Sequence, residues 1–396
     1  MTSPHPLSTK LNNAQEHLSS EEIDGWLLYD YRGMNPIFAD TIGAIANVTR
    51  PCWLWVPVSG GPRLLVSYVD QGRFEHLGIE TLLWVSRSQM RDRLRELLRG
   101  ARVVAMEYSP EGALPRVSWV DAGTVEMVRE LGVEVVSSAD TVQYATQRWS
   151  AADLVSHREA AGRLGTIIQD AFQYIGERLS EGPTEYDVAE FIRSGFREEG
   201  MEAPDGPVVA VNEHGADPHF DPTPANSHVI AMGDWVLIDL WARMQGEENM
   251  YADITWTAYV GDTVPSEHRE VFEVVAGARD AAVAAIAGHF ERGRSPQGWE
   301  IDKVARDYVA DAGYGERFSH RLGHSIGREV HGNAVNLDSW ETHDTRRLMP
   351  GIATSVEPGI YLPGKFGVRS EIDVYISEDG PVVTTAIQRE PVMIGR

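Results

Sequence analysis

The chain has 396 residues, of which 42% are hydrophobic and 9% aromatic, and its formal net charge at pH 7 is −24. This length allows two domains with hydrophobic cores, and the negative charge argues against nucleic acid and anionic membranes as partners. The single cysteine, Cys52, excludes an intrachain disulfide and favours a reducing compartment. Residues 1–13 are polar, and no stretch approaches the roughly 18 apolar residues of a membrane span, so we expect a soluble, cytoplasmic protein.

Short apolar runs alternate with helical patterns as far as about Ser150, which indicates an α/β domain over residues 1–149. The expected strands are Trp26–Tyr31, Trp53–Val56, Leu64–Tyr68, Leu82–Val85 and Val103–Met106, and the expected helices are Ser88–Arg99 and Val117–Leu131.

Residues 150–396 form a second predicted domain, which opens with two helices. Ser150 with Asp153 and Thr184 with Asp187 are spaced as N-cap pairs, and an apolar helical stripe follows the first of them. Further helices are expected near residues 266–288 and 299–312. Strand runs alternate with these helices, so the sequence predicts two helix-plus-sheet halves.

Two aspartates lie in the strands of the first half. Asp239 interrupts the apolar run 235–241, where an ionised carboxylate is costly unless it is paired or bound to a metal. Asp253 follows on a second strand, residues 251–260. The polar and glycine-containing loop 243–249 lets the two strands pair as a hairpin, which places both aspartates on one face if the register agrees.

Two glutamates lie in the strands of the second half. Glu357 is followed by Pro358 and a glycine that end its strand, which places the side chain at a strand end. Strand alternation over residues 367–374 puts Arg369, Glu371 and Asp373 on one face. A charged face between hydrophobic residues suggests a lined cavity, although a solvated edge strand with an Arg–Glu pair fits the same pattern.

Three histidines stand in glycine-rich or turn-like segments. His324 and His331 lie seven apart among glycines that allow close backbone approach, and His219 lies in a turn-like segment. Isolated histidines are more often structural or exposed than functional, and we assign that default to His214, His228, His268 and His320.

These residues offer four carboxylates and an imidazole. If the fold brings Asp239, Asp253, His324, Glu357 and Glu371 together, they make a site for two divalent cations. Four carboxylates without cations would repel one another and take up protons, whereas two dications supply four positive charges against the four negative ones.

The ordered series Asp239, Asp253, Gly323-His324, His331, Val356-Glu357-Pro358-Gly359 and Arg369-Ser370-Glu371 resembles the pita-bread metallopeptidases, over roughly residues 205–380. That family comprises methionine aminopeptidases, proline-specific aminopeptidases and prolidases. The tract Tyr29–Pro36 also resembles the N-terminal domain of bacterial Xaa-Pro peptidases. The resemblance implies an α/β (α+β) fold, with a creatinase-like N-terminal α/β domain over residues 1–149 and a pita-bread catalytic domain over residues 150–396.

The resemblance also implies roles for the site residues. Asp239, Asp253, His324, Glu357 and Glu371 would hold two metal ions, for which manganese, cobalt and zinc are all suitable. Glu357 would act as general base and then general acid, while His331 and His219 would contact the substrate and stabilise developing charge. We expect Arg32, Arg369 and His331 to bind substrate. Asp373 is expected to contact the ligands at most, without binding metal itself. The assembly is expected to be a homodimer.

The expected reaction is hydrolysis of the Xaa-Pro bond of small peptides. The N-terminal domain argues against a methionine aminopeptidase, and Arg32 could hold the C-terminal carboxylate of a dipeptide, which favours an Xaa-Pro dipeptidase. An Xaa-Pro aminopeptidase acting on longer peptides remains the alternative. A metal-free creatinase-type hydrolase or a non-catalytic peptide-binding module would be expected to have lost ligands that this chain keeps.

Two features depart from the family pattern. The segment between Asp239 and Asp253 is a few residues longer than in most relatives, and Ile372 stands where an acid often follows the last glutamate. In familiar prolidases an arginine binds the C-terminal carboxylate of the substrate, and the matching position in this chain falls near His343. Arg346 and Arg347 are close to that position in sequence, but neither aligns with that arginine.

Overall fold

The computed structural model describes residues 6–395, and the chain divides into two compact units, one ending at Arg148 and the other beginning at Trp149. The two units are described separately. Among the described helices, none combines the length and the apolar character that a membrane span requires.

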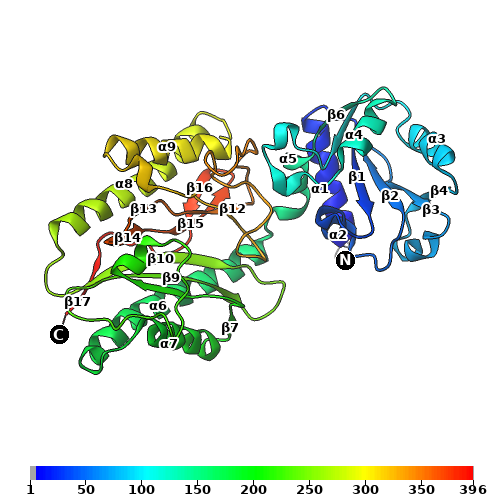
Figure 1. Cartoon of the computed structure of the whole chain (residues 1–396). Helices are drawn as coiled ribbons and strands as arrows, with labels where there is room; N and C mark the ends of the chain where they lie inside the picture. The colour runs from blue at the N-terminus through cyan, green and yellow to red at the C-terminus, as the bar shows by residue number, and fades with distance from the viewer. Residues whose placement is uncertain (1–5, 396) are drawn as a thin grey trace. The chain divides into compact units, whose positions relative to one another are not determined.

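The first unit is a six-stranded mixed sheet in the order β4-β3-β2-β1-β5-β6 (Figure 1). The strands are β1 (Gly25–Tyr31), β2 (Pro51–Pro57), β3 (Arg63–Ser67), β4 (Glu80–Trp84), β5 (Val103–Met106) and β6 (Glu134–Ser137). The helices are α1 (Pro6–Ser20), α2 (Pro36–Ile42), α3 (Arg87–Leu97), α4 (Ala122–Arg129) and α5 (Ala139–Val142).

The central strand β1 explains the continuous apolar runs of this unit. Trp26 and Leu28 point into a core shared with α1 and α2, whereas Leu27 and Tyr29 face a second core shared with α3 and α4. Because successive side chains of a strand point to opposite faces, a sheet covered on both faces needs apolar residues at nearly every position.

The five strands expected in this unit are confirmed, but the expected helix Val117–Leu131 is wrong in its first turns. The amides of Trp119 and Val120 both donate to the carbonyl of Glu107, which holds this stretch in a bend. The helix α4 begins only after Asp121, whose Oδ1 accepts from the amide of Thr124 at 3.0 Å.

The second unit begins with two helices against a sheet. The helices are α6 (Ala151–Arg178) and α7 (Glu185–Glu198), and the sheet contains β7 (Met201–Glu202), β8 (Val208–Val211), β9 (Trp235–Met244), β10 (Ala252–Val260) and β17 (Val392–Ile394). Both expected N-cap pairs are confirmed as reciprocal capping boxes, Ser150 with Asp153 and Thr184 with Asp187.

Alternation along the hairpin β9–β10 separates the core from the aspartates. Ile238 and Leu240 of β9 and Ile254 of β10 pack into the core with α6 and α7. The residues between them therefore face the opposite side of the sheet. Asp253 pairs with Trp241 and Thr255 pairs with Asp239, a register that confirms the expectation that both aspartates share one face.

The second half of this unit holds two helices, a four-stranded sheet and a two-stranded ribbon (Figure 1). These are α8 (Ser266–Glu291), α9 (Gly298–Asp311), the sheet β11 (Ser325–Ile326), β12 (Ala353–Val356), β15 (Ile372–Ser377) and β16 (Gly380–Val383), and the ribbon β13 (Gly359–Leu362) with β14 (Phe366–Arg369).

The expected continuous strand over residues 367–374 is interrupted in the structure. The strand β14 ends at Arg369, Ser370 and Glu371 lie outside strands, and β15 begins at Ile372. At the break, the Glu371 amide donates to the Thr255 carbonyl of β10 at 3.2 Å. Glu371 is buried, which excludes the solvated edge strand.

Candidate metal centre

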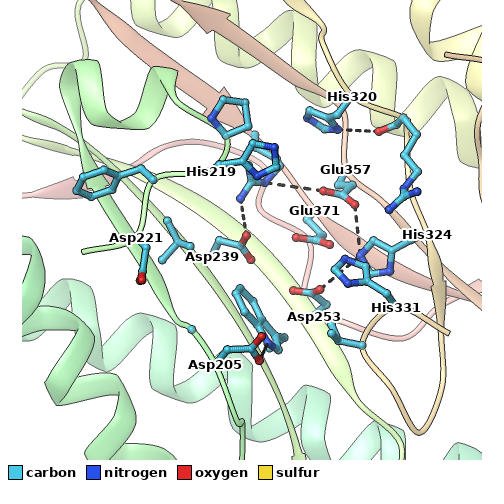
Figure 2. A pocket seen from close by; sticks show the side chains of 18 of the residues that line it. Asp205, His219, Asp221, Asp239, Asp253, His320, His324, His331, Glu357 and Glu371 are labelled. Atoms are coloured by element: carbon cyan, nitrogen blue, oxygen red, sulfur yellow. Dashed lines mark hydrogen bonds and ion pairs between the residues drawn. The ribbon is translucent and has the colours of Figure 1, made fainter. Parts of the chain in front are cut away.

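A cavity of about 750 Å³ in the second unit is lined by all five candidate ligands and by both candidate substrate histidines. Figure 2 shows the ligands pointing toward one another from strands and loops of the two halves. The residues are Asp239, Asp253, His324, Glu357, Glu371, His219 and His331.

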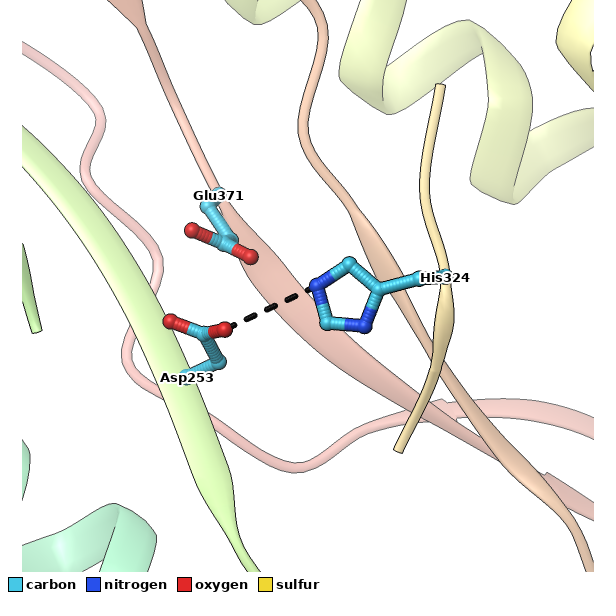
Figure 3. Close-up of side chains that lie close together, drawn as sticks. All are labelled: Asp253, His324 and Glu371. Atoms are coloured by element: carbon cyan, nitrogen blue, oxygen red, sulfur yellow. Dashed lines mark ion pairs between the residues drawn. The ribbon is translucent and has the colours of Figure 1, made fainter. Parts of the chain in front are cut away.

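Three of the ligands form a tight cluster. One donor atom each from Asp253, His324 and Glu371 lies within 4.8 Å of the other two, and all three residues are buried. Figure 3 shows the His324 ring directed at the two carboxylates, with its Nε2 3.7 Å from Asp253 Oδ2. Nε2 also lies 3.4 Å from Oε1 of Glu357.

Backbone contacts set the orientation of the His324 ring. Its Nδ1 lies 3.2 Å from the carbonyl oxygen of Ser325, an acceptor only. A proton on Nδ1 leaves the Nε2 lone pair directed at the carboxylates, which is the tautomer a metal ligand needs. The amide of His324 is held by Ser355 Oγ at 2.9 Å, which fixes the backbone beneath the ring.

The carboxylates lie close together, with Asp253 and Glu371 buried and Asp239 and Glu357 half-buried. Asp239 Oδ1, Asp253 Oδ1 and Glu371 Oε1 are buried atoms with no hydrogen-bond partner among the described residues. Burial first, and neighbouring carboxylates second, raise the pKa of Asp253 and of Glu371 well above the usual range. Unpaired buried oxygens with this repulsion are the features expected of a donor set that binds divalent cations.

Glu357 lies between the cluster and an arginine. Burial raises the pKa of its carboxyl to about 7, although the positive charge of Arg369 acts in the opposite direction. Its Oε1 accepts from Ser355 Oγ at 3.1 Å, and its Oε2 lies 3.9 Å from Arg369 Nε. A carboxyl with a pKa near neutrality can both accept and release a proton in that range.

Arg369 is buried beside the carboxylates, and its guanidinium already has partners within the chain. It pairs with Asp239 Oδ2 and donates to Tyr361 Oη at 3.0 Å and to Thr255 Oγ1 at 3.1 Å. These bonds use three of the five N–H donors of the guanidinium. Its predicted role in substrate binding stays a prediction.

The two candidate substrate histidines lie at the cavity surface. His331 is exposed, and its ring stands edge-on to that of His324 with 4.3 Å between centroids. His219 is also exposed and belongs to a loop that buries Phe220 against His214. The buried carboxylate of Glu185 accepts from His214 Nδ1 at 2.9 Å, so it anchors this loop.

Asp373 lies behind the ligands, as expected. It is fully buried, and its Oδ2 accepts from the amide of Asp253 at 2.9 Å and lies 3.9 Å from Nε2 of the buried His157. This arrangement holds the backbone of Asp253 in place.

Arg32 lies in the first unit, where its backbone has a positive φ of 63° and its side chain is exposed. The carboxylate of the nearby Asp30 accepts from the amides of Gly33 and Asn35 at 2.8 and 2.9 Å. The role of Arg32 in substrate binding stays a prediction. Arg346, near in sequence to the expected prolidase arginine, is buried against Asp344.

Sequence patterns missed several residues of the cavity wall, among them Asp205, Asp221, Arg321 and Glu341. His320, to which we gave a structural or exposed role by default, also lines the cavity, with its Nε2 2.8 Å from Tyr361 Oη. Burial, and then the charge of Arg369, lower its pKa to about 3. In the sequence, only the position of His320 four residues before His324 indicated that it could lie near the site.

The chain is similar to known peptidases over most of its length. The model of metallopeptidase family M24 matches residues 158–378. A relative named probable dipeptidase PepE, from Mycobacterium tuberculosis, is 29% identical over 86% of this chain and 85% of its own length. An Xaa-Pro dipeptidase from Pyrococcus furiosus is 35% identical over 54% of this chain and 57% of its own length.

Solved structures give the same result. The crystal structure of dipeptidase PepE from Mycobacterium ulcerans superimposes with a TM-score of 0.67 and 25% identity, and the match covers 98% of both chains. The fold is the two-domain α/β architecture with a pita-bread unit that this comparison and the sequence both indicate. With more than half of its residues matched by the family model, this chain belongs to metallopeptidase family M24.

Proposed function

We propose that this chain is an Xaa-Pro dipeptidase that uses two divalent cations, held by Asp239, Asp253, His324, Glu357 and Glu371. The observation that carries the proposal is the buried cluster of Asp253, His324 and Glu371, whose carboxylates retain unpartnered oxygens at a cavity wall. The donor set is mostly carboxylate with one imidazole, which suits manganese, cobalt or zinc. Bound there, the cations would acidify water and polarise the scissile carbonyl.

The residues of the chain then divide the remaining tasks. Glu357 takes a proton from the attacking water and returns it to the leaving amine, a role for which its carboxylate is placed in the cavity beside the other ligands. His331 and His219 donate hydrogen bonds to the scissile amide and stabilise the oxyanion that develops on its oxygen. Arg369 holds Asp239 in place through their ion pair.

The substrate preference rests on the relatives. Relatives named as dipeptidases cover most of this chain, and one covering just over half of it is named for Xaa-Pro substrates. We propose further that residues 1–149 are the N-terminal domain and residues 150–396 the catalytic domain of a cytoplasmic homodimer. The single cysteine, Cys52, is buried, which is compatible with a reducing compartment.

A combined measurement of metal and turnover tests the proposal. The protein, purified without chelator, is expected to carry about two divalent ions per chain and to hydrolyse Ala-Pro. A chelator should abolish this activity, and manganese or cobalt should restore it. Turnover that a chelator leaves unchanged would contradict the metallopeptidase mechanism, and equal turnover of Ala-Pro and Ala-Pro-Ala would favour the aminopeptidase alternative.

A further inference from the structure

The cavity wall contains two arginines that differ in what they contact. Arg369 donates to Asp239, Tyr361 and Thr255, so three of its five N–H donors are used within the chain. Arg321 also lines the cavity, but its guanidinium donates no hydrogen bond to any residue that the structure describes. Only 24% of the Arg321 side chain is exposed, so most of this cation is removed from solvent.

Arg321 is held in place by its backbone and by one neighbouring acid. Its amide donates to Oε1 of Glu341 at 3.1 Å, while its Nη1 stands 3.6 Å from Oε2 of the same carboxylate. Its carbonyl oxygen lies 2.7 Å from Nδ1 of His320, which fixes the residue from the other side (Figure 2). Glu341 therefore positions the guanidinium without occupying its donors, and because its side chain is 43% exposed, water weakens their attraction.

The position of Arg321 is close enough to the ligands to matter for substrate. Arg321 lines the same cavity as His324 and Glu357 and stands three residues before His324 in the chain. A mostly buried guanidinium whose N–H groups donate no hydrogen bond is stabilised by an anionic partner. The parallel N–H donors of its planar group match the two oxygens of a carboxylate.

Charges on the cavity wall also give a substrate a direction. The exposed acids Asp205 and Asp221 line the cavity, and Figure 2 places them across the ligand cluster from His320. A zwitterionic dipeptide bound across the cluster would therefore have its ammonium toward these acids and its carboxylate toward the segment that contains Arg321.

We infer that Arg321, positioned by Glu341, is the receptor for a carboxylate of the substrate peptide and thereby sets which peptides this site accepts. The inference rests on the proposed peptidase function and names its specificity-determining residue. The carboxylate could be the C-terminal one of a dipeptide or that of an acidic side chain, and substrates that carry only one of them separate the two sources.

The test compares Ala-Pro with its C-terminal amide on wild type and on Arg321→Gln. Losing a charge-assisted contact should lower kcat/KM for Ala-Pro by about 10- to 100-fold, mainly through KM, and leave the amide within about threefold. Arg321→Lys should recover part of the preference, because it keeps the charge without the fork. Arg317→Gln is the matched control, since Arg317 is exposed in the same segment and does not line the cavity.

A second pair of substrates, Glu-Pro amide and Ala-Pro amide, identifies the source of the carboxylate. A preference for Glu-Pro amide that Arg321→Gln removes assigns the receptor to an acidic side chain, and a preference for free Ala-Pro over its amide assigns it to the C-terminus. If Arg321→Gln removes neither preference, or lowers all rates equally, the inference is overturned. It is also overturned if Arg32→Gln, tested in parallel, is the variant that removes the preference.

Failure of the proposed function leaves a distinct signature. If wild type cleaves none of these peptides, they are stable in its presence and their binding to metal-loaded protein can be measured by calorimetry. Tighter binding of Ala-Pro or Glu-Pro amide than of Ala-Pro amide, lost in Arg321→Gln but not in Arg317→Gln, supports the receptor without catalysis. Equal binding of the three peptides by wild type contradicts it.

Discussion

The two sides of the ligand cluster neutralise their charge in different ways. On one side Asp239 is paired with Arg369, a cation that the chain itself supplies. On the other side, neither Asp253 nor Glu371 accepts a hydrogen bond from an arginine or lysine among the described residues. Burial raises the pKa of both carboxyls. We therefore expect the Asp253–Glu371 side to depend more on a bound cation than the Asp239 side, which Arg369 partly compensates.

The largest expected effect comes from removing a carboxylate of the Asp253–Glu371 side. Glu371→Gln should lose bound metal and lower turnover of Ala-Pro by more than about 10³-fold, because ligands that act together fail together. The metal-free variant should be at least as stable as metal-free wild type, since a buried charge without a cation has been removed. Metal analysis, turnover and thermal unfolding on one sample test this, and wild-type turnover in the variant would refute the ligand assignment.

On the Asp239 side, removal of the paired arginine should lower the stability of the metal-free protein. Arg369→Gln leaves Asp239 without its cation, and breaking a buried pair in this way costs about 3–5 kcal/mol. The loss should be largest in metal-free protein and smaller once divalent cations replace the missing charge. Chemical unfolding with and without manganese measures the difference, and an equal loss in both conditions would contradict the role given to Arg369.

The His331→Ala variant tests whether the His331 ring, which lies next to that of His324, binds metal. His331→Ala should keep the bound ions and slow Xaa-Pro hydrolysis by about 10²–10³-fold, the range for one positioned hydrogen-bond donor. His343→Ala is a control, because His343 packs on Trp299 and does not line the cavity. If the ions leave together with the His331 imidazole, His331 is a ligand and the assignment of His324 as the single histidine ligand is wrong.

Glu357 lies between the two sides and gives the smallest predicted effect, a dependence of stability on pH. Burial raises its pKa from 4.5 to about 7, so the folded state binds this proton more tightly than the unfolded chain does. The stabilisation is fully present below pH 4.5 and is lost as pH rises through about 7, a change of about 3 kcal/mol.

The measurement compares unfolding of metal-free wild type and Glu357→Gln across this range. The comparison is needed because burial also raises the pKa of Glu107, in the first unit, to about 7. The pH dependence of Glu107 is common to both proteins and cancels in their difference. With saturating metal the trend should reverse, since the ligands must then be deprotonated. An unchanged difference across the range would contradict the raised pKa of Glu357.

Local patterns predicted much of the site because its residues lie in regular elements. Alternation in the β9–β10 hairpin was sufficient to place Asp239 and Asp253 on one face, and the capping pairs located α6 and α7. The break after Arg369 was not predictable, because it depends on a hydrogen bond from the Glu371 amide to Thr255 of another sheet.

Arg321 and His320 could not be found from local patterns for a related reason. They lie in an irregular segment before His324, where no periodicity indicates the direction of a side chain. Their positions depend on contacts far along the chain, with Glu341 for one and Tyr361 for the other. Such contacts are decided by tertiary packing, which the sequence does not display as a pattern.

The metal content of matched variants tests the central claim most directly. Wild type, Asp253→Asn and Asp239→Asn, each loaded with manganese and desalted, are analysed by mass spectrometry for ions per chain. The account predicts about two ions in wild type, the larger loss in Asp253→Asn, and a smaller loss in Asp239→Asn. No bound ions in wild type, or two ions retained in Asp253→Asn, would contradict it.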